Sequence, residues 1–407
     1  MARRILPTEH GFSERQRKSM AILDAIRRGG PVAKTDVSRS TQINIVTVSS
    51  YIEQFIARGL VVEKGLGHSR GGRIPLLVDL NRTAGFAIGI GWTLTDIVGV
   101  VVDLAGNPLV QERIPKPDTI NEEVIKRIAD LANGLIHHGT QVDPKKVKGI
   151  GIGIPGIIDE TGHRIRWPHP PVGSSDVLLN VSVSDLFERR FQLPVSVIND
   201  ADAAVFGEKW FSVEYEREHI LYMYSGVSCG IMINGQIYGG KDGYAGELGI
   251  YSLKEKQEAV EAIKTTLGRW DTDLGIVEAT QKSLRGGAQS LLMELLNGNI
   301  EKIDFRMILQ AAERGDALAA QQLKQGAVAL GKKIAFLVNL LNPELIVIGG
   351  GIEIAKHLIL DTIRETVKEW AFEEATQSLK IVPSRLGDSA MAIGSACMML
   401  RDVYMGV

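Results

Sequence analysis

The sequence predicts an N-terminal winged helix-turn-helix, in which helices are followed by a β-wing, joined to a larger α/β domain with two lobes. Its 407 residues are too many for one ordinary domain. Three helical patterns followed by a hairpin pattern occupy the first 80 residues. Beyond Gly85, strand meanders alternate with helical patterns, and this order occurs twice. We therefore expect an internally duplicated α/β domain with a cleft between its lobes.

The three N-terminal helices are predicted from caps, apolar spacing and stop signals. Ser13 and Gln16 form a capping-box pattern at the start of a helix over 13–28, which the glycines and proline at 29–31 end. A short helix over 34–40 and a turn at 42–44 follow. The third helix runs from about Asn44 or Ile45 to Arg58, and one face of it is apolar: Val48, Ile52, Phe55 and Ile56.

The remaining elements follow from strand and helix periodicity. Apolar runs at 60–63 and 74–78, with glycines at 65 and 67 between them, predict the hairpin of the wing. The first half of the α/β part is predicted to contain strands over 86–92, 96–103 and 147–154 and a helix over 121–138. The second half is predicted to contain strands over 220–224, 230–234, 236–238 and 345–348, and helical regions over about 286–340 and 352–368.

The charge is distributed unevenly along the chain. Residues 1–80 carry 13 Lys and Arg against 7 Asp and Glu, or +6, whereas the remainder carries 33 against 41, or −8. A basic head on an acidic body favours contact between the head and nucleic acid. The sequence holds no run of about 18 apolar residues, and no apolar segment follows its basic start, so we expect neither a membrane span nor a secretory signal. Cys229 and Cys397 lie in apolar surroundings, which is typical of reduced, buried thiols in a cytoplasmic protein.

The third helix is the candidate reading helix for double-stranded DNA. Opposite its apolar stripe it carries side chains small and polar enough to reach base edges: Asn44, Thr47, Ser49, Ser50 and Gln54. Tyr51 is placed to reach a phosphate, and Lys34, at the start of the second helix, joins the predicted DNA-binding set. A merely solvated helix face is the alternative for this pattern.

The segment after the wing is a candidate minor-groove contact. Gly71 and Gly72 let the backbone approach closely, and Arg70 and Arg73 flank them. Arginines are drawn to the negative potential of a narrow, A·T-rich minor groove. A plain flexible loop is the alternative.

Taken in order, the motifs resemble the ROK family, named for its repressors, unassigned reading frames and sugar kinases. The resemblance covers nearly the whole chain. It rests on the glycine-arginine joint at 71–75, the strand opening at 84–91, the glycine-rich segment 149–159, the stretch 199–208, the segment 243–249 and the late glycine turn at 348–352. The resemblance implies an actin-like, hexokinase-like (ribonuclease H-like) α/β domain.

The resemblance also implies a sugar-binding site. It assigns Pro155 and Gly156 to a loop beside the sugar, and Glu247 and Glu278 to the sugar side of the second lobe. Asn199 and Asp200 supply an amide and a carboxylate, the groups that pair with hydroxyls able both to donate and to accept. In the family's kinases, the residue that matches Asp200 is the general base. A turn or a helix cap is the alternative role for Asp200.

Departures from the kinase pattern indicate a regulator without phosphoryl transfer. The family's kinases carry Asp-x-Gly-Gly-Thr at the first strand, where this sequence has Gly89 for the aspartate and Trp92 for the second glycine. Phosphoryl transfer needs that carboxylate for Mg²⁺ and that small turn for phosphates. The family's zinc site is also missing, because Ile250 replaces its histidine and residues 251–285 contain no cysteine or histidine. We expect no metal and no cofactor.

The sequence therefore predicts a repressor of carbohydrate-utilisation genes that binds operator DNA and a carbohydrate effector as a homodimer or homotetramer. An active ATP-dependent sugar kinase with an appended head and a constitutive regulator with a vestigial pocket are the alternatives. We place the winged helix-turn-helix and linker at 1–82 and the effector domain at 83–407. Lobe one spans about 83–200 plus the C-terminal helix, and lobe two about 201–388.

Overall fold

The computed structural model describes most of the chain. The described residues are 12–66, 75–92, 96–115, 122–137, 142–154, 157–158, 165–166, 178–179, 182–211, 217–224, 228–248, 274–296 and 298–406. Within them, none of the helices combines the length and the apolar character that crossing a membrane requires.

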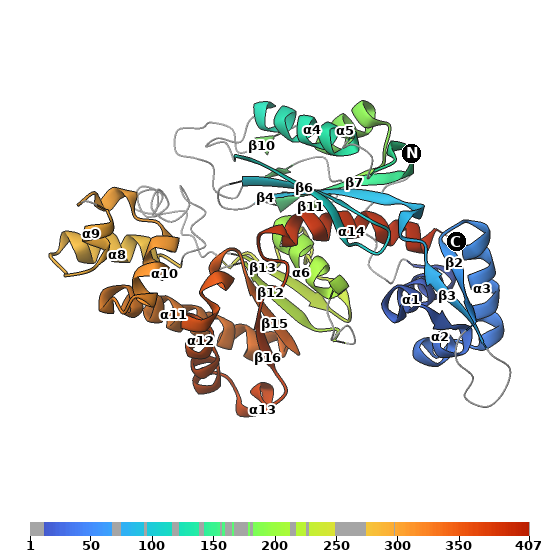
Figure 1. Ribbon diagram of the computed structural model, residues 1–407. Coiled ribbons are helices and arrows are strands. Elements are labelled where there is room, and N and C mark those ends of the chain that lie inside the picture. Colours follow the sequence, from blue (N-terminus) through green and yellow to red (C-terminus); the bar gives the residue numbers. More distant parts are fainter. Residues whose placement is uncertain are drawn as a thin grey trace.

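The N-terminal head is a three-helix unit with a small antiparallel sheet (Figure 1). The capping box is confirmed, since the Gln16 N–H donates to Ser13 Oγ at 3.3 Å and the Ser13 N–H donates to Gln16 Oε1 at 2.9 Å. The sheet order is β1-β3-β2, and the two-residue strand β1 was not predicted. The elements are α1 (Glu14–Gly29), β1 (Val32–Ala33), α2 (Lys34–Thr41), α3 (Ile45–Ala57), β2 (Val61–Leu66) and β3 (Leu76–Leu80).

The body contains two five-stranded sheets with the same strand order. In each, an antiparallel meander of three strands is followed by two parallel strands, which confirms the predicted duplication. The first sheet is β11-β7-β4-β5-β6, from β4 (Phe86–Trp92), β5 (Asp96–Val102), β6 (Pro108–Pro115), β7 (Val147–Ile154) and β11 (Val195–Asn199). The second is β14-β13-β12-β15-β16, from β12 (Ile220–Tyr224), β13 (Ser228–Ile233), β14 (Gln236–Ile237), β15 (Leu345–Gly349) and β16 (Lys380–Pro383).

Helices cover both sheets. α4 (Glu122–Ile136) and α5 (Val183–Phe191) pack on the first sheet, and α11 (Ala317–Leu341) and α12 (Lys356–Trp370) pack on the second. The region predicted to be helical over about 286–340 contains several separate helices. The shorter elements are β8 (Ile157–Ile158), β9 (Ile165–Arg166), β10 (Leu178–Leu179), α8 (Ile276–Arg285), α9 (Leu292–Leu295), α10 (Phe305–Glu313), α13 (Glu373–Thr376) and the 3-10 turns Arg82–Ala84, Pro144–Lys146, Ile300–Lys302, Ile352–Ala355 and Gly387–Ser389.

Two helices run between the sheets and reach the head. α6 (Asp200–Phe211) and α14 (Ala390–Met405) pack closely against each other, and α14 continues to α1 of the head (Figure 1). At their crossing, a Cβ atom on Gly394 would collide with the carbonyl oxygen of Ala203, so only glycine allows this approach. Continuous helices therefore connect the region between the two sheets with the head.

The head and the body share one hydrophobic core. Ile22, Leu23 and Ile26 of α1 belong to the same buried cluster as Leu400 and Tyr404 of α14. Ser19 Oγ donates to the Tyr404 carbonyl at 2.5 Å across this junction. Both cysteines are buried free thiols, as predicted. The position of the head is thus fixed by packing as well as by its chain connection.

Candidate functional site

The outer face of α3 is formed by residues four and three apart. The buried stripe Val48, Ile52 and Phe55 faces the head core. We call the opposite set, which is exposed, the outward ridge: Val46, Ser50, Glu53 and Ala57. The outward ridge is the face of α3 that is most accessible to a binding partner.

The predicted DNA-binding residues of α3 fall around this ridge in different environments. Asn44 caps the helix, because its Oδ1 accepts from the Thr47 N–H at 2.9 Å. Asn44 and Ser50 are exposed, whereas Thr47 and Ser49 are half-buried on the flanks. Asn44 therefore fixes the N-terminal end of α3.

Tyr51 and Lys34 are held by other parts of the head. The Tyr51 hydroxyl donates to the Arg15 carbonyl of α1 at 3.2 Å, and its ring lies 6.1 Å from that of Phe55. The Lys34 ammonium lies 3.6 Å from the Glu53 carboxylate. Lys34 thereby offsets the negative charge on the outward ridge.

The sequence prediction missed two exposed apolar residues at the start of α3. Val46 is 76% exposed and Ile45 is 41% exposed. They were omitted because only polar side chains were considered as readers. Helical spacing could have predicted the exposure of Val46. Val46 lies two positions before the buried Val48 and therefore on the opposite side of the helix.

The glycine-arginine segment cannot be placed. Arg70, Gly71, Gly72 and Arg73 lie outside the described residues, as do Pro155, Gly156 and Ile250. The strands on either side, β2 and β3, pair in antiparallel fashion as the hairpin prediction required.

Asn199 and Asp200 lie where the carboxyl end of β11 meets the start of α6. β11 pairs in parallel with β7, and Asn199 is opposite Ile154, the residue before Pro155. Asn199 Oδ1 accepts from the Ala201 and Asp202 N–H groups at 2.9 and 3.2 Å, so Asn199 caps α6. Asn199 and Asp200 thus lie at the carboxyl ends of the parallel strands of the first sheet, the usual position for a ligand site in α/β folds.

The Asp200 carboxyl group is buried and incompletely paired. Its Oδ1 accepts from the Ala201 N–H at 2.7 Å, while Oδ2 is without a hydrogen-bond partner among the described residues. Burial, with a further contribution from the Glu247 carboxylate, raises the pKa of Asp200 to about 7. Burial and the charges of Asp200 and Glu247 also raise the pKa of Asp202. A hydroxyl donor at Oδ2 would stabilise the ionised form of Asp200.

The charge of Glu247, next to the second sheet, acts on the Asp200 carboxyl group. Glu247 forms an isolated β-bridge with Ser228 at the start of β13. Glu278 is exposed in the first turn of α8, and none of the interactions recorded within the described ranges joins it to Asp200 or Glu247. In the same ranges, His, Cys, Asp and Glu side chains form no cluster suited to a metal ion.

The start of the body has no room for an additional side chain at Gly89. A Cβ atom there would collide with the carbonyl oxygen of Ala392 in α14. Trp92, at the end of β4, is 3% exposed and is part of the core between the sheets. An aspartate at position 89 would require α14 to move away from β4.

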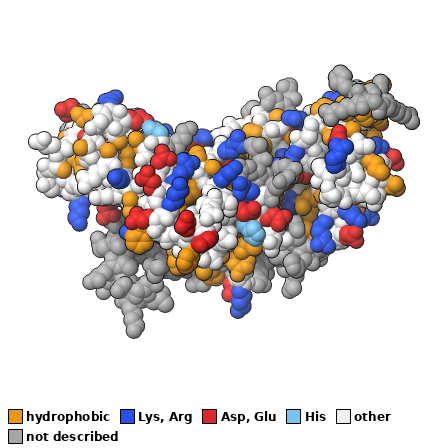
Figure 2. Space-filling model, turned by 90° about the horizontal axis from the view of Figure 1, so that it is seen from below, with side chains coloured by type: hydrophobic (Ala, Val, Ile, Leu, Met, Phe, Trp, Pro, Cys, Tyr) orange, Lys and Arg blue, Asp and Glu red, His pale blue; other side chains and the backbone are white. Residues whose placement is uncertain are grey.

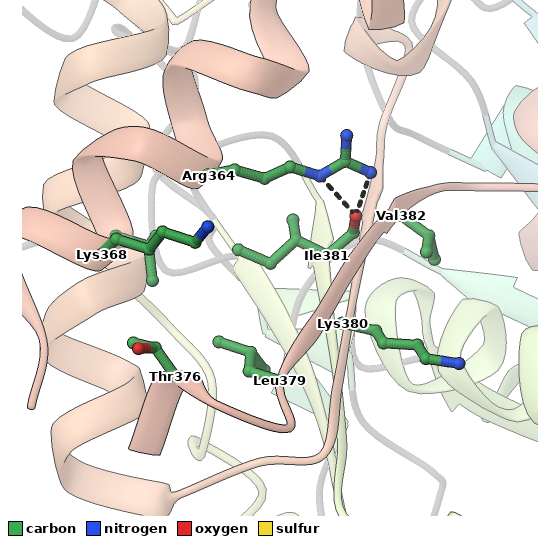
Figure 3. A pocket seen from close by; sticks show the side chains of 8 residues that line it. Arg364, Lys368, Thr376, Leu379, Lys380, Ile381 and Val382 are labelled. Atoms are coloured by element: carbon green, nitrogen blue, oxygen red, sulfur yellow. Dashed lines mark hydrogen bonds between the residues drawn. The ribbon is translucent and has the colours of Figure 1, made fainter. Parts of the chain in front are cut away.

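A separate hollow of about 320 Å³ lies between α12 and β16 (Figure 3). Arg364 points across it and donates from Nε and Nη2 to the Ile381 carbonyl at 3.2 and 2.8 Å. β16 is an edge strand, and these bonds satisfy one of its edge carbonyls. The position of the Arg364 side chain across this hollow is explained by its hydrogen bonds to the edge strand.

Comparisons with known proteins agree with this architecture. The profile of the ROK family matches residues 86–402. The chain is 28% identical to a xylose repressor of Caldicellulosiruptor bescii, over 96% of both chains. A solved ROK family transcriptional regulator, described as a homolog of the E. coli MLC protein, superimposes with a TM-score of 0.74 at 23% identity, covering 96% of this chain and 97% of that one. A ROK family glucokinase from Streptomyces griseus, solved with glucose and AMPPNP, has a TM-score of 0.63 at 25% identity and covers 77% of this chain and 99% of that one.

Proposed function

The chain belongs to the ROK family, and from that premise we propose that it is a DNA-binding transcriptional regulator that represses carbohydrate-utilisation genes. A sugar or sugar derivative controls its binding to operator DNA. The similarity to a xylose repressor supports this proposal because it covers head and body alike. The similar glucokinase, by contrast, covers 77% of the chain.

The observation that carries the proposal is a head with an exposed reading helix whose core is continuous with that of the effector domain. α3 presents its outward ridge to solvent, while α1 packs on α14. α6 begins at Asp200, in the candidate effector site, and ends beside the head at Trp210 and Phe211. A ligand that changes the spacing of the two sheets would therefore also shift the head.

Two features support a binding protein without phosphoryl transfer. The backbone of α14 occupies the space beside Gly89, where the kinase pattern needs a carboxylate for Mg²⁺. Trp92, which stands where the kinase pattern has its second glycine, is a buried core residue. The carboxylates Asp200 and Glu247 remain suited to sugar hydroxyls, with Asn199 as the cap that fixes Asp200.

The partners in this proposal are double-stranded operator DNA, a carbohydrate effector and further copies of the same chain, as a homodimer or homotetramer in the cytoplasm. An even number of heads suits an operator with two half-sites. The DNA contacts are assigned to α3, to Lys34 and to the glycine-arginine segment with Arg70 and Arg73. The division into a head over 1–82 and an effector domain over 83–407 belongs to the same proposal.

The test begins with selection of bound duplexes from a randomised library by the full-length protein. Gel-shift titrations on the selected duplex, with and without each member of a panel of mono- and disaccharides, then identify an effector. We expect one class of sugar to change DNA affinity and to raise the melting temperature. Sugar-dependent ATP consumption would instead establish the kinase, and specific DNA binding that no sugar alters would favour a constitutive regulator.

A further inference from the structure

The most exposed large hydrophobic side chain among the described residues is at the reading end of α3. Val46 is 76% exposed and is the second residue of the helix, directly after the cap Asn44 and Ile45. It stands at the first position of the outward ridge, ahead of Ser50 and Glu53. No charged residue lies in this first turn.

Folding alone gives no reason for valine at this position. Its side chain contributes little to the head core because it points away from Val48 and Ile52. Valine is also a poorer helix former than alanine or the long polar residues, since its branched Cβ restricts χ1 against the preceding turn. An exposed, stiff apolar group at the tip of a helix is suited to contact with an apolar partner.

We propose that Val46 reads the 5-methyl group of a thymine in the major groove. This inference rests on the proposed function, and it assigns the ridge a base preference. The N-terminal residues of a recognition helix are those that contact base edges. Among the four bases, thymine alone presents a methyl group in the major groove, and apolar side chains contact it there.

Ser50 and Glu53, the next residues of the outward ridge, are compatible with contact between Val46 and a base. Ser50 lies four residues further on, about 6 Å along the helix axis, and is exposed on the same face of α3. The Glu53 carboxylate at the distal end is paired with Lys34 at 3.6 Å, which reduces its repulsion of phosphates. Ser50 and Glu53 therefore need not move when Val46 contacts a base.

The experiment compares thymine with uracil, because the two bases pair identically and differ only in the 5-methyl group. Full-length protein selects its duplex from a randomised library, and single thymines in that duplex are then replaced by uracil one at a time on both strands. Affinities are measured for the wild type and for Val46→Ala. Leu186→Ala is the matched control, since Leu186 is also an exposed apolar residue, 43% exposed, but lies on α5 of the body.

We expect one uracil position in each half-site to weaken wild-type binding by about fourfold, the factor that corresponds to burial of one methyl group. Leu186→Ala should behave as the wild type. Val46→Ala should bind the thymine duplex more weakly and lose the distinction at that position alone, with a melting temperature close to that of the wild type.

Two results would overturn the inference, and they are distinguishable. If the wild type selects no sequence, the proposed function fails and this inference fails with it. If the wild type selects a sequence but Val46→Ala discriminates thymine from uracil just as strongly at every position, the proposed function stands and Val46 is not the reader.

Discussion

Asp200 combines a buried carboxyl group with an oxygen that lacks a partner in the described part of the chain. Burial is costly for a charge unless hydrogen bonds compensate it. In the ligand-free protein, burial therefore destabilises the ionised form of Asp200. Asp200 is the first residue of α6, the helix that reaches the head. This residue gives rise to two predictions.

The first prediction concerns stability against pH. Because the folded-state pKa of Asp200 is raised to about 7 from an ordinary 3.8, the folded state binds more protons than the unfolded state between these values. The free energy of unfolding should thus fall as pH rises through this window, by about 1.4 kcal/mol for each unit of pKa difference. Asp200→Asn should lose this contribution and exceed the wild type in melting temperature at pH 8.

Melting curves from pH 5 to 8 without ligand measure the effect. Asp242→Asn, at an exposed carboxylate, is the control and should retain the wild-type pH dependence. Parallel curves for Asp200→Asn and the wild type would show that this carboxyl group is not the titrating group.

The second prediction concerns the effector response. Asp200→Ala should leave a sugar hydroxyl unpaired, at a cost of roughly 1.5–3 kcal/mol for a hydrogen bond to a charged group. The sugar concentration for half response in a gel shift should rise by about tenfold to a hundredfold, while DNA affinity without sugar stays the same. The same direction is expected for Asn199→Ala and Glu247→Ala. Wild-type response in Asp200→Ala would exclude its carboxylate from the effector site.

At the scale of elements, α6 links the candidate effector site to the head. Its far end carries Trp210, whose carbonyl accepts from Arg27 Nη2 of α1 at 3.0 Å. The Arg27 guanidinium also lies 4.6 Å from the centre of the Trp210 ring and pairs with Asp24 at 2.6 Å. Its side chain is only 7% exposed, so these contacts are shielded from water. Arg27 therefore provides a polar connection between the head and the body, in addition to the hydrogen bond from Ser19 to Tyr404.

Arg27→Met should weaken the attachment of the head while preserving the apolar stem. The lost hydrogen bonds correspond to roughly 1–3 kcal/mol, so amide hydrogens of α1 should exchange about tenfold or more faster. Hydrogen-exchange mass spectrometry measures this. Arg39→Met, which removes an exposed arginine paired with Asp36 within α2, should leave α1 protection unchanged. Equal α1 exchange in Arg27→Met and the wild type would contradict the role of this contact.

Elements with strong local signals were predicted well, and those that depend on tertiary contacts were not. The helix that begins after Ser13 follows from its capping box, and the strands β4, β5, β12 and β13 follow from periodicity. The edge strand β6 was missed because proline stands at both its ends and most of its residues are exposed. The region 286–340 is divided where Gly298 and Gly315 adopt positive φ and where Asp304 and Asp316 cap the next helices, signals that the prediction overlooked.

In the candidate sites, too, features with local sequence signals were predicted and features that depend on tertiary contacts were not. Asn199 and Asp200 were found because their motif is local and distinctive. The raised pKa of Asp200 could not be predicted, since it arises from burial by segments distant in sequence. Val46 was missed for a different reason, namely the assumption that only polar residues read DNA. The burial pattern of α3 shows that Val46 is exposed, a property that side-chain polarity alone does not reveal.

At the scale of the whole molecule, one exposed apolar surface is large enough to concern assembly. Phe336 and Leu340 of α11 are 66% and 63% exposed, and Trp370 and Phe372 at the end of α12 are 53% and 69% exposed. Asn339 joins them, because its Oδ1 accepts from the Phe372 N–H at 2.9 Å and its Nδ2 donates to the Trp370 carbonyl at 3.5 Å. We call these four hydrophobic side chains the apolar patch.

The apolar patch suits a second copy of the chain. Aromatic side chains carry about 150–250 Å² each, so the patch leaves on the order of 400–500 Å² uncovered, about half of the ~800 Å² that each partner of a stable complex buries. The Lys332 ammonium lies 4.2 Å from the Trp370 ring centre, and glutamates 369, 373 and 374 are exposed nearby in sequence. Figure 2 shows that charges of both signs are interspersed with hydrophobic side chains on the underside of the molecule. A surface of mixed charge favours contact with a second copy of the same surface over contact with a partner that carries a single sign of charge.

The last prediction follows from this surface and from the need for two heads on an operator. Phe336→Ser combined with Trp370→Ser should give a monomer by size-exclusion chromatography with light scattering, whereas the wild type and Leu109→Ser, altered at an exposed residue of β6, should be dimers or tetramers. Because a second head bound to the same duplex adds avidity, the monomer should bind a two-half-site duplex about a hundredfold more weakly and a single half-site as the wild type does. A wild-type monomer, or a double variant of unchanged mass, would exclude the apolar patch as the contact. Loss of single half-site binding would instead indicate damage to the head, which the patch does not touch.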